Sequence, residues 1–476
     1  MKFRFFILLL AAVSLLSACS PNQKGYRVVD GTIVFDVPQR IEGQKSVLGL
    51  RTEPLETVRV GFIGLGMRGP GAVERFTWLE GVEIKALCDL LPDRVASAQK
   101  ILTGKGLPAA AEYSGEDGWK ALCERDDIDL VYICTGWQLH VPMAVYAMQH
   151  GKHVAVEVPA ATTLEECWQL VDVAEQTQRH CMMLENCVYD FFELTTLNMA
   201  HHGLFGEIEH VEGGYIHNLD EFWNQYEGNW RLSFNQSHRG DVYATHGLGP
   251  ACQLLDIHRG DRMTRLVSMD TPSINGTATA RKLMDADSFA NGDHTLTMIQ
   301  TARGRSILLQ HNVYTPRPYS REYQVTGTEG FANKYPVQGF AFRPDNQQED
   351  AIPDMEDLNQ HSFVPEYIMK PLMEKYKHPI VKDIEELAKK VGGHGGMDFI
   401  MDYRLVYCLR NGLPLDQDVY DAAEWSCIGN LSAVSIENGN MPVEFPDFTR
   451  GDWNRIQGYR HATVEEQQDV AVAQGK

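Results

Sequence analysis

The chain has 476 residues, of which 43% are hydrophobic and 22% charged, as in a globular protein large enough for two domains. Its formal net charge of −21 argues against nucleic acid as a partner, because phosphate binding requires basic patches. The same charge argues against broad docking on anionic lipid, and solubility is its simplest role.

The N-terminus is typical of an export signal. Lys2 and Arg4 precede an apolar run from Phe5 to Leu16, which is shorter than a membrane-spanning helix. The run ends in "LSAC", which resembles a bacterial lipobox, where the cysteine (here Cys19) is lipidated and becomes the mature N-terminus. An ordinary signal peptide or a transmembrane anchor is the alternative, but small residues before the cysteine favour a lipoprotein.

This signal predicts where the protein is found. Ser20 follows Cys19, so the aspartate that would indicate inner-membrane retention is missing. We expect an exported bacterial lipoprotein on the outer membrane, facing the periplasm or the surface, which contacts the membrane only through the lipid on Cys19. Residues 1–19 are then a signal peptide, and residues 20–56 a polar tether or extension.

The remaining nine of the ten cysteines lie mostly in apolar runs such as "VYICTG" and "VYCLR". The sequence has no CxxC motif. Buried free thiols explain these cysteines better than a disulfide scaffold or a zinc site, and we expect no metal site.

From residue 57 to 186 the pattern alternates between strands and helices. Continuous apolar runs predict strands, and amphipathic stretches between them predict helices. Such an alternation predicts a doubly wound parallel sheet that helices cover on both faces, an α/β fold of the Rossmann type. The predicted strands are 58–64, 82–89, 128–136, 153–158 and 181–185, and the clearest helices are 71–80 and 92–102.

The pattern changes after about residue 187. Alternating segments such as "EIEHVEGGYIHN", "SILLQHNVYT" and "REYQVTGTEG" are separated by longer polar and aromatic stretches. They predict an α+β domain with a large, mainly antiparallel sheet over residues 187–451. We expect residues 452–476 to be a C-terminal tail.

A glycine motif follows the first predicted strand and precedes a helix. Gly64, Gly66 and Gly69 fit G-x-G-x-x-G, whose glycines permit a tight turn and the close approach of backbone to a pyrophosphate at a helix N-terminus. Asp89 ends the next strand, where a carboxylate accepts hydrogen bonds from a ribose diol and repels a 2′-phosphate. The motif therefore predicts an NAD site, with a purely structural glycine turn as the alternative.

Two further strand ends are predicted to reach the cofactor. "CTGWQLHVPMA" places residues 135–140 after one strand, and "VEVPAA" places residues 157–159 after the next. Ligands of open parallel sheets bind outside the carboxyl ends of the strands. Both segments should therefore contact the nicotinamide half of the dinucleotide.

These three motifs together resemble the Gfo/Idh/MocA family of sugar-active NAD(P) enzymes. Most members of that family carry Glu-Lys-Pro in the third motif, with the lysine beside the nicotinamide and substrate, whereas this chain has Val158. "EVPAATT", "MMLENC", "GLFGEI", "VEGGYIHN", "VYATHGLGP", "PRPYS", "GGHGGMDF" and "EFPDFTRG" look like glycoside hydrolase family 109. These are NAD-dependent α-N-acetylgalactosaminidases, and the resemblance covers residues 58–451.

The resemblance implies two sets of contacts, carried over onto the matching positions. The residues that would contact NAD, beside the glycine motif, are Met67, Arg68, Asp89, Trp137, Gln138, Leu139, His140, Glu157, Val158 and Asn186. The residues that would contact the sugar are Tyr215, Arg231, Tyr243, Ala244, Thr245, His246 and Tyr319. The substrate would be an α-GalNAc-terminated glycan or glycoconjugate.

The family mechanism, as the resemblance implies it, is oxidation, elimination, addition and reduction. The sugar C3 hydroxyl is oxidised by hydride transfer to NAD⁺, a base removes the acidified C2 proton, and the aglycone leaves C1. Water adds at C1, and the hydride returns to C3. NAD is recycled in each turnover, so a tightly held dinucleotide needs no external pool outside the cytoplasm.

His246 is the first candidate for the base at the C3 hydroxyl, because neutral imidazole suits proton transfer near pH 7. Its alternative is a structural histidine. Tyr215 is a candidate base at C2 or a ligand of the hydroxyls, and as a base a phenol needs help from its neighbours. His217, two residues on, shares its strand face and is a candidate to assist it, or is a polar rim residue. His394 lies in a glycine-rich turn that either brings it near the site or only needs open backbone angles.

Two other functions stay open on the sequence. An NAD-dependent sugar oxidoreductase of the same fold would produce stoichiometric NADH, and the export signal and Val158 count against it. A catalytically silent carbohydrate-binding lipoprotein would not need Tyr215, His246 and the glycine motif. Open antiparallel sheets of such folds often pair with another subunit, so a homodimer is expected by analogy.

Overall fold

The computed structural model describes residues 25–345, 352 and 358–465 of the chain. The predicted signal peptide and Cys19 lie outside the described residues. Within the described part, none of the helices combines the length and the apolar character needed to cross a bilayer. The nine cysteines of that part are free, and eight of them are buried, as their apolar surroundings predict.

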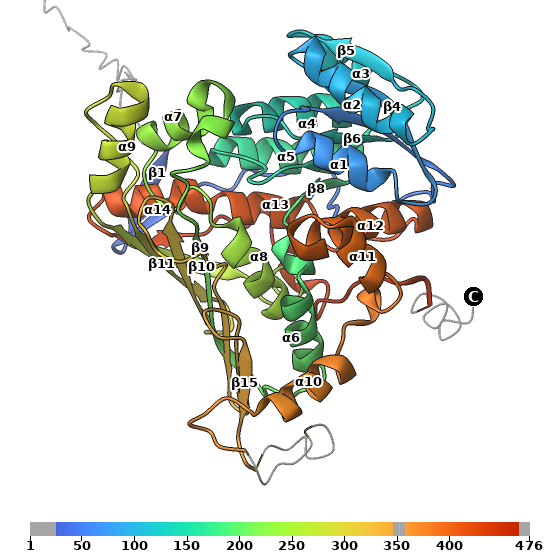
Figure 1. Ribbon diagram of the computed structural model, residues 1–476. Coiled ribbons are helices and arrows are strands. Elements are labelled where there is room, and N and C mark those ends of the chain that lie inside the picture. The colour runs from blue at the N-terminus through green and yellow to red at the C-terminus, as the bar shows by residue number, and fades with distance from the viewer. Residues whose placement is uncertain (1–24, 346–351, 353–357, 466–476) are drawn as a thin grey trace, which may run out of the picture.

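The first of two sheets is the predicted Rossmann sheet, at the upper right of Figure 1. Its six strands are parallel, in the order β5-β4-β3-β6-β7-β8. They are β3 (Val58–Ile63), β4 (Val82–Asp89), β5 (Ala111–Ser114), β6 (Leu130–Ile133), β7 (His153–Val156) and β8 (Cys181–Met183). The strands β6, β7 and β8 are buried throughout, which explains their unbroken apolar runs.

Five helices connect these strands. They are α1 (Gly69–Phe76), α2 (Pro92–Gly104), α3 (Gly118–Cys123), α4 (His140–Gln149) and α5 (Leu164–Thr177). The helix α1 begins two residues before the predicted start at 71 and ends four residues before the predicted end at 80. The helix α5 begins with a capping box, in which the Thr163 hydroxyl accepts from the Glu166 N–H and the Glu166 side chain accepts in return.

The second sheet has ten strands in the order β1-β2-β16-β10-β11-β12-β9-β13-β14-β15. It is mainly antiparallel, as predicted, but β9 pairs with β12 and β2 with β16 in parallel. The strands are β1 (Tyr26–Val29), β2 (Thr32–Phe35), β9 (Ile208–Ile216), β10 (Met263–Asp270), β11 (Thr295–Thr301), β12 (Ser306–Asn312), β13 (Tyr323–Gly327), β14 (Gly330–Asn333), β15 (Gly339–Phe342) and β16 (Val443–Glu444).

One face of this sheet is covered by helices. The helix α8 (Thr245–Leu254) packs on β9, and α14 (Ile428–Glu437) packs on β10. The other face carries exposed apolar side chains, including Met269 and Met298, so β11 alternates strictly between buried and exposed residues. The remaining helices are α6 (Phe191–His201), α7 (Trp230–Ser237), α9 (Ile274–Met284), α10 (Glu366–Lys375), α11 (Glu385–Val391), α12 (Met397–Asn411) and α13 (Val419–Ser426).

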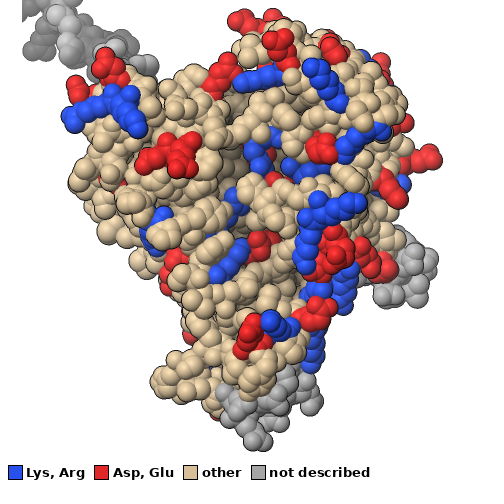
Figure 2. All heavy atoms as spheres, in the orientation of Figure 1, with Lys and Arg blue, Asp and Glu red and all other residues tan. Residues whose placement is uncertain are grey.

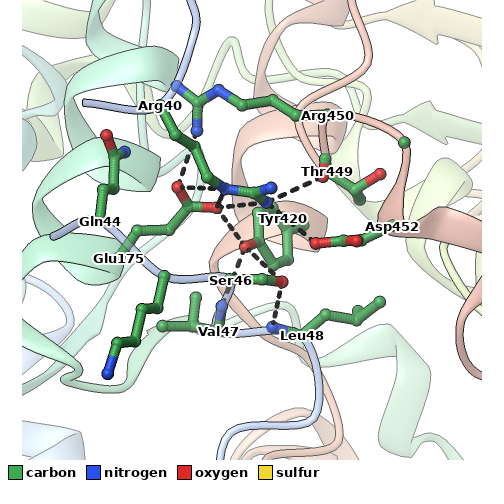
Figure 3. Close-up of polar contacts among 12 residues, drawn as sticks. Arg40, Gln44, Ser46, Val47, Leu48, Glu175, Tyr420, Thr449, Arg450 and Asp452 are labelled. Atoms are coloured by element: carbon green, nitrogen blue, oxygen red, sulfur yellow. Dashed lines mark hydrogen bonds and ion pairs between the residues drawn. The ribbon is translucent and has the colours of Figure 1, made fainter. Parts of the chain in front are cut away.

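The segment before the Rossmann domain is an ordered extension. The hairpin of β1 and β2 forms the edge of the ten-stranded sheet, beside β16. The chain then runs past α5, which carries the fully buried carboxylate of Glu175. This carboxylate accepts hydrogen bonds from Arg40 and Arg450 at 2.8 to 3.1 Å and from the Tyr420 hydroxyl at 2.5 Å (Figure 3). One carboxylate of the Rossmann domain thereby holds the extension, α13 and the C-terminal region together.

We expect Glu175→Ala to lower the free energy of unfolding by about 3 kcal/mol, because it removes the buried carboxylate that two guanidinium groups share and leaves them only the partly exposed Asp452 and Asp172. Urea unfolding of the mature chain measures the loss. Arg27→Ala is the matched control, since the Arg27–Asp36 ion pair is mostly exposed and its loss should hardly change stability. A Glu175→Ala variant as stable as the control would contradict this role.

Candidate functional site

Two adjoining cavities lie between the Rossmann sheet and the second domain. The glycine-loop cavity, of about 520 Å³, is lined by the glycine motif, Asp89 and the residues after β6 and β7. The histidine cavity, of about 410 Å³, is lined by residues of both domains, among them His246, His217 and His394. Met67, Arg68, Glu157, Val158, Gln225, Tyr226, Arg231 and Tyr243 line both cavities. Figure 2 shows this face of the molecule hollowed between the α7 region and the Rossmann domain, with basic side chains in the hollow.

The glycine loop has room only for glycine at two positions. Gly64 has φ of +90°, and a Cβ there would lie 2.7 Å from the Cys134 backbone. A Cβ on Gly69, the first residue of α1, would lie 2.0 Å from the Gly64 carbonyl oxygen. The N-terminus of α1 has no side-chain cap, so its N–H groups remain available to an anion. The loop therefore fits a dinucleotide pyrophosphate, as the motif predicts.

Asp89 lines the same cavity, but its carboxylate already accepts hydrogen bonds from the protein backbone. One carboxylate oxygen accepts from the Leu65 N–H at 2.6 Å, and the other accepts from the Leu91 N–H at 2.9 Å. The side chain thus holds the glycine loop in shape as well as presenting a negative charge at the end of β4. A carboxylate oxygen has a further lone pair, so this arrangement still fits a ribose diol.

The segment after β6 contributes only some of its predicted contacts. Trp137, Leu139 and His140 line the glycine-loop cavity, whereas Gln138 is exposed and lies outside its lining. Both ring nitrogens of His140 lie against backbone carbonyls, those of Pro159 at 2.8 Å and Thr135 at 3.0 Å. His140 therefore ties the ends of β6 and β7 together, and only its ring is available to a cofactor.

The wall shared by the two cavities is aromatic and cationic. The Arg231 guanidinium lies over the rings of Tyr243 at 4.4 Å, Trp137 at 5.1 Å and Tyr226 at 5.2 Å, and it donates to the Tyr226 hydroxyl at 2.6 Å. Such ring contacts stabilise a buried cation without neutralising it. Arg231, Tyr215, Tyr243, His246 and Tyr319 all line the histidine cavity, whereas the buried residues Ala244 and Thr245 at the start of α8 are absent from its lining.

A histidine–glutamate pair lies at the base of the histidine cavity. The Nδ1 atom of His246 is 2.8 Å from the Oε1 atom of Glu185, whose side chain is fully buried. Burial lowers the pKa of His246 below its usual value, although the Glu185 carboxylate acts in the opposite direction. The ring is therefore neutral at pH 7, with Nδ1–H directed to Glu185 and the Nε2 lone pair left for a ligand.

Tyr215 and His217 lie beside this pair on β9 and at its end. The Tyr215 hydroxyl is 3.0 Å from the Nδ1 atom of His217, and the Tyr215 ring centroid is 5.4 Å from that of His246. Burial lowers the pKa of His217 to about 4, so this ring is also neutral. The three predicted proton-transfer residues thus lie in one group.

Sequence reasoning missed several residues of the site. Glu185 follows β8 within "MMLENC", and its place at the carboxyl end of a parallel strand was a usable signal. Arg321 precedes β13 and lines the histidine cavity next to Tyr319.

His394 also lines the histidine cavity, and its Nδ1 atom is 2.9 Å from Asp398, so the glycine-rich turn does bring this histidine to the site. Asn186 donates to Asp398 at 2.6 Å.

Glu185, Cys187 and His246 bring their ligand atoms within 4.8 Å of one another. The Glu185 carboxylate already accepts from His246 and from the Cys187 N–H. Burial raises the pKa of the Cys187 thiol, and the Arg321 guanidinium lies 2.9 Å from its sulfur. The metal-binding form of cysteine is the thiolate, and burial keeps this thiol protonated, so the group is better described as a hydrogen-bonded support for His246.

Comparison with known proteins adds to this geometry. Residues 189–455 match the C-terminal domain of glycosyl hydrolase 109, and residues 58–185 match the NAD-binding Rossmann fold of an oxidoreductase family. A Bacteroides fragilis protein described as glycosyl hydrolase family 109 protein 1 is 65% identical over 429 residues, which cover 90% of this chain and 92% of the relative. The chain belongs to glycosyl hydrolase family 109. It is a glycoside hydrolase with an NAD-binding oxidoreductase fold.

Further relatives agree with the assignment to glycosyl hydrolase family 109. A Porphyromonas gingivalis member of the family is 61% identical over 465 residues, which cover 96% of this chain and 99% of the relative.

Levoglucosan dehydrogenase in complex with NADH and levoglucosan shares the fold, with a TM-score of 0.60 at 19% identity, over 82% of this chain and 100% of that one. The prediction of a Rossmann domain followed by an α+β domain is confirmed, and so are NAD and the family.

We expect Gly69→Ala to weaken NAD binding at least ~10-fold, or about 1.4 kcal/mol, because the added Cβ would collide with the Gly64 carbonyl and open the loop. The NAD content of the purified protein and titration of NAD into the stripped protein measure the loss. Gly71→Ala is the matched control, since its Cβ would meet only Arg75 Nη1, at 3.5 Å. Equal NAD binding by both variants would refute the role of the close approach.

Proposed function

We propose that this family member removes terminal α-linked N-acetylgalactosamine from a glycan or glycoconjugate by oxidation, elimination, addition and reduction. The observation that carries the proposal is the joint wall of the two cavities. The cofactor-binding loop and His246 line two adjoining cavities that share eight lining residues, so a sugar in the histidine cavity would lie against the nicotinamide end of the glycine-loop cavity.

When bound, NAD⁺ supplies a hydride acceptor for the sugar C3–H bond and afterwards a hydride donor to the same carbon. His246 is oriented to take the C3 hydroxyl proton at Nε2, because Glu185 holds Nδ1–H and stabilises the imidazolium that forms. The buried carboxylate fixes the tautomer and the direction of the ring. On the return step the same nitrogen gives the proton back.

Tyr215 is the residue placed to remove the C2 proton. Its hydroxyl is held by His217, and its ring packs against those of His246 and Tyr243, with centroid distances of 5.4 and 4.7 Å. Arg231 and the rings around it would bind the sugar hydroxyls or the acetamido carbonyl, since its Nε atom is buried without a hydrogen-bond partner among the described residues. Tyr319, 44% exposed at the cavity mouth, offers a ring on which a pyranose can stack.

A sugar oxidoreductase is the second candidate, since the solved neighbours of this fold are dehydrogenases. Among the described residues that line the two cavities there is no lysine, and Val158 occupies the position after Glu157. A cationic proton donor beside the nicotinamide is thus missing. This feature favours the glycosidase, in which Tyr215 and the histidines perform the proton transfers.

Hydrolysis of a chromogenic α-N-acetylgalactosaminide in deuterated water, without added NAD, tests the proposal. We expect chromophore release, with deuterium at C2 of the freed sugar by NMR, because proton removal and return at C2 exchange it with solvent. Release without deuterium would leave two options, a base that is shielded from solvent or direct displacement by carboxylates. Stoichiometric NADH without release would establish the oxidoreductase.

His246→Ala serves as the paired variant in this assay. We expect the rate to fall by about 10²–10⁴-fold, while NAD remains bound. The wild-type rate should fall in acid as His246 takes up a proton, because the neutral ring is the base and burial lowers its pKa. His150→Ala, an exposed histidine after α4, should keep full activity.

We also propose that the chain is a lipoprotein whose only membrane contact is the lipid on Cys19. The "LSAC" motif after a basic and apolar leader supports this proposal. Cys19→Ser should shift the protein from the detergent-soluble membrane fraction to the aqueous phase and abolish labelling with a fatty acid analogue. Retention of both properties by the variant would refute lipidation at this residue.

A further inference from the structure

Arg321 lies directly opposite Tyr215 on the floor of the histidine cavity. Ile216 pairs with Ser320, and Gly213 pairs with Tyr323 in the antiparallel ladder of β9 and β13, so Tyr215 faces Arg321. Directly opposed residues of an antiparallel pair project from the same face of the sheet. Both side chains accordingly line the histidine cavity.

The guanidinium of Arg321 is buried among neutral groups. Its Nη1 atom is 3.0 Å from the Asn186 side-chain oxygen, 2.9 Å from the Cys187 sulfur and 3.9 Å from the Met397 sulfur. The residue is 6% exposed, and its Nε atom is buried without a hydrogen-bond partner in the described part of the chain. No ion pair within 4.0 Å joins Arg321 to a carboxylate among the described residues.

Other buried arginines of this protein have a carboxylate partner. Arg75 lies 2.6 Å from Asp402, Arg259 lies 2.7 Å from Asp421, and Arg404 lies 2.7 Å from Asp416. Burying a cation without a counter-charge is costly, so an unpaired guanidinium that lines a ligand cavity indicates an anion that forms there. Arg231, whose guanidinium lies 6.0 Å from the centre of the Tyr215 ring, is likewise paired only with rings and a hydroxyl.

Both guanidinium groups are neighbours of Tyr215. The other titratable groups that face it are His217, Tyr243, His246 and His311, with ring centroids between 4.7 and 6.4 Å, and Tyr226 and Glu185 lie beyond them. The histidines among them are neutral at pH 7, since burial lowers each of their pKa values. The cations that face the phenol are therefore Arg231 and Arg321.

We propose that Arg321 is a positioning residue for Tyr215, which keeps its hydroxyl available as a phenolate for removal of the sugar C2 proton. The inference rests on the proposed function. In the step, the phenolate oxygen forms an O–H bond with the C2 proton, and the C–H electron pair moves into the C2–C3 bond and onto the C3 carbonyl oxygen. The net charge stays at −1, and it moves from the phenolate to the enolate oxygen beside the same guanidinium. Departure of the aglycone from C1 then uses that electron pair.

The direction of the electrostatic effect follows from the surroundings. Burial raises the pKa of Tyr215, whereas Arg231 and Arg321 lower it. Removing the charge of Arg321 should raise that pKa further, so less phenolate exists at any pH below it. Activity that depends on the phenolate should then continue to rise with pH up to a higher pH in the variant than in the wild type.

The test compares Arg321→Lys, which keeps a charge, with Arg321→Gln and Arg321→Met, which remove it. We expect kcat for the chromogenic α-N-acetylgalactosaminide at neutral pH to fall about 10²-fold without the charge, and about 10-fold or less with lysine. The loss in the uncharged variants should shrink only when the pH rises past the wild-type Tyr215 pKa, which burial holds above its usual value, with NAD content unchanged. Arg239→Gln, in a partly exposed pair with Asp270 outside both cavities, is the control for losing an arginine.

NMR titration of ¹³C-labelled tyrosine, with Tyr215→Phe to assign the signal, supplies a readout that does not depend on the sugar reaction. The Tyr215 pKa should be higher in Arg321→Gln than in the wild type. An unchanged pKa, or a loss of kcat with the same pH profile as the wild type, would overturn the inference. If the wild type released no sugar, the proposed function would fail, while the titration would still decide whether Arg321 acts on Tyr215.

Discussion

The site depends on one buried carboxylate, that of Asp398 at the start of α12. It accepts from Asn186 at the end of β8, from His394 in the glycine-rich turn, and from Arg68 in the glycine loop at 3.2 Å. Burial alone would raise the pKa of Asp398, but the hydrogen bond from His394 and the charges of Arg68 and Arg75 hold it well below its usual value. A permanently ionised carboxylate thus fastens the loop that cradles the cofactor to the cavity proposed for the sugar.

This connection has a functional consequence. Hydride transfer requires the donor carbon and the acceptor to be held within contact distance, and small displacements are costly in rate. Arg68 contacts both Asp398 and Glu157, so the glycine loop, the end of β7 and the C-terminal domain share one network. The wall common to the two cavities is fixed by these ionic contacts rather than by a flexible loop alone.

The partners of the buried arginines divide these residues into those that stabilise the fold and those that face the histidine cavity. Arg75, Arg259 and Arg404 are neutralised by carboxylates and serve the fold. Arg231 and Arg321 face the histidine cavity with rings, amide oxygen and sulfur around them, and these groups do not cancel a charge. Under the proposed mechanism, these uncompensated cations would stabilise the negative charge that remains when a proton leaves the sugar.

The sequence by itself determined the Rossmann domain, the change to a mainly antiparallel domain, and the cofactor. The reason is local: apolar strand periodicity and the steric demand for glycine at Gly64 and Gly69 act over short stretches of chain. It also pointed to His246, Tyr215 and Arg231 through the family resemblance. It placed Gln138, Ala244 and Thr245 at the site as well, because it could not tell which neighbours in a short motif turn away from the cavity.

Only the tertiary structure decided which distant residues meet. Glu185 supports His246 across 61 positions, Asn186 reaches Asp398 across 212, and Arg321 opposes Tyr215 through the pairing of β9 with β13. The role of Asp89 in shaping the glycine loop and the path of residues 40–44 past α5 also depend on long-range contacts. Burial and pairing of charges arise between segments far apart in the chain, so no local pattern records them.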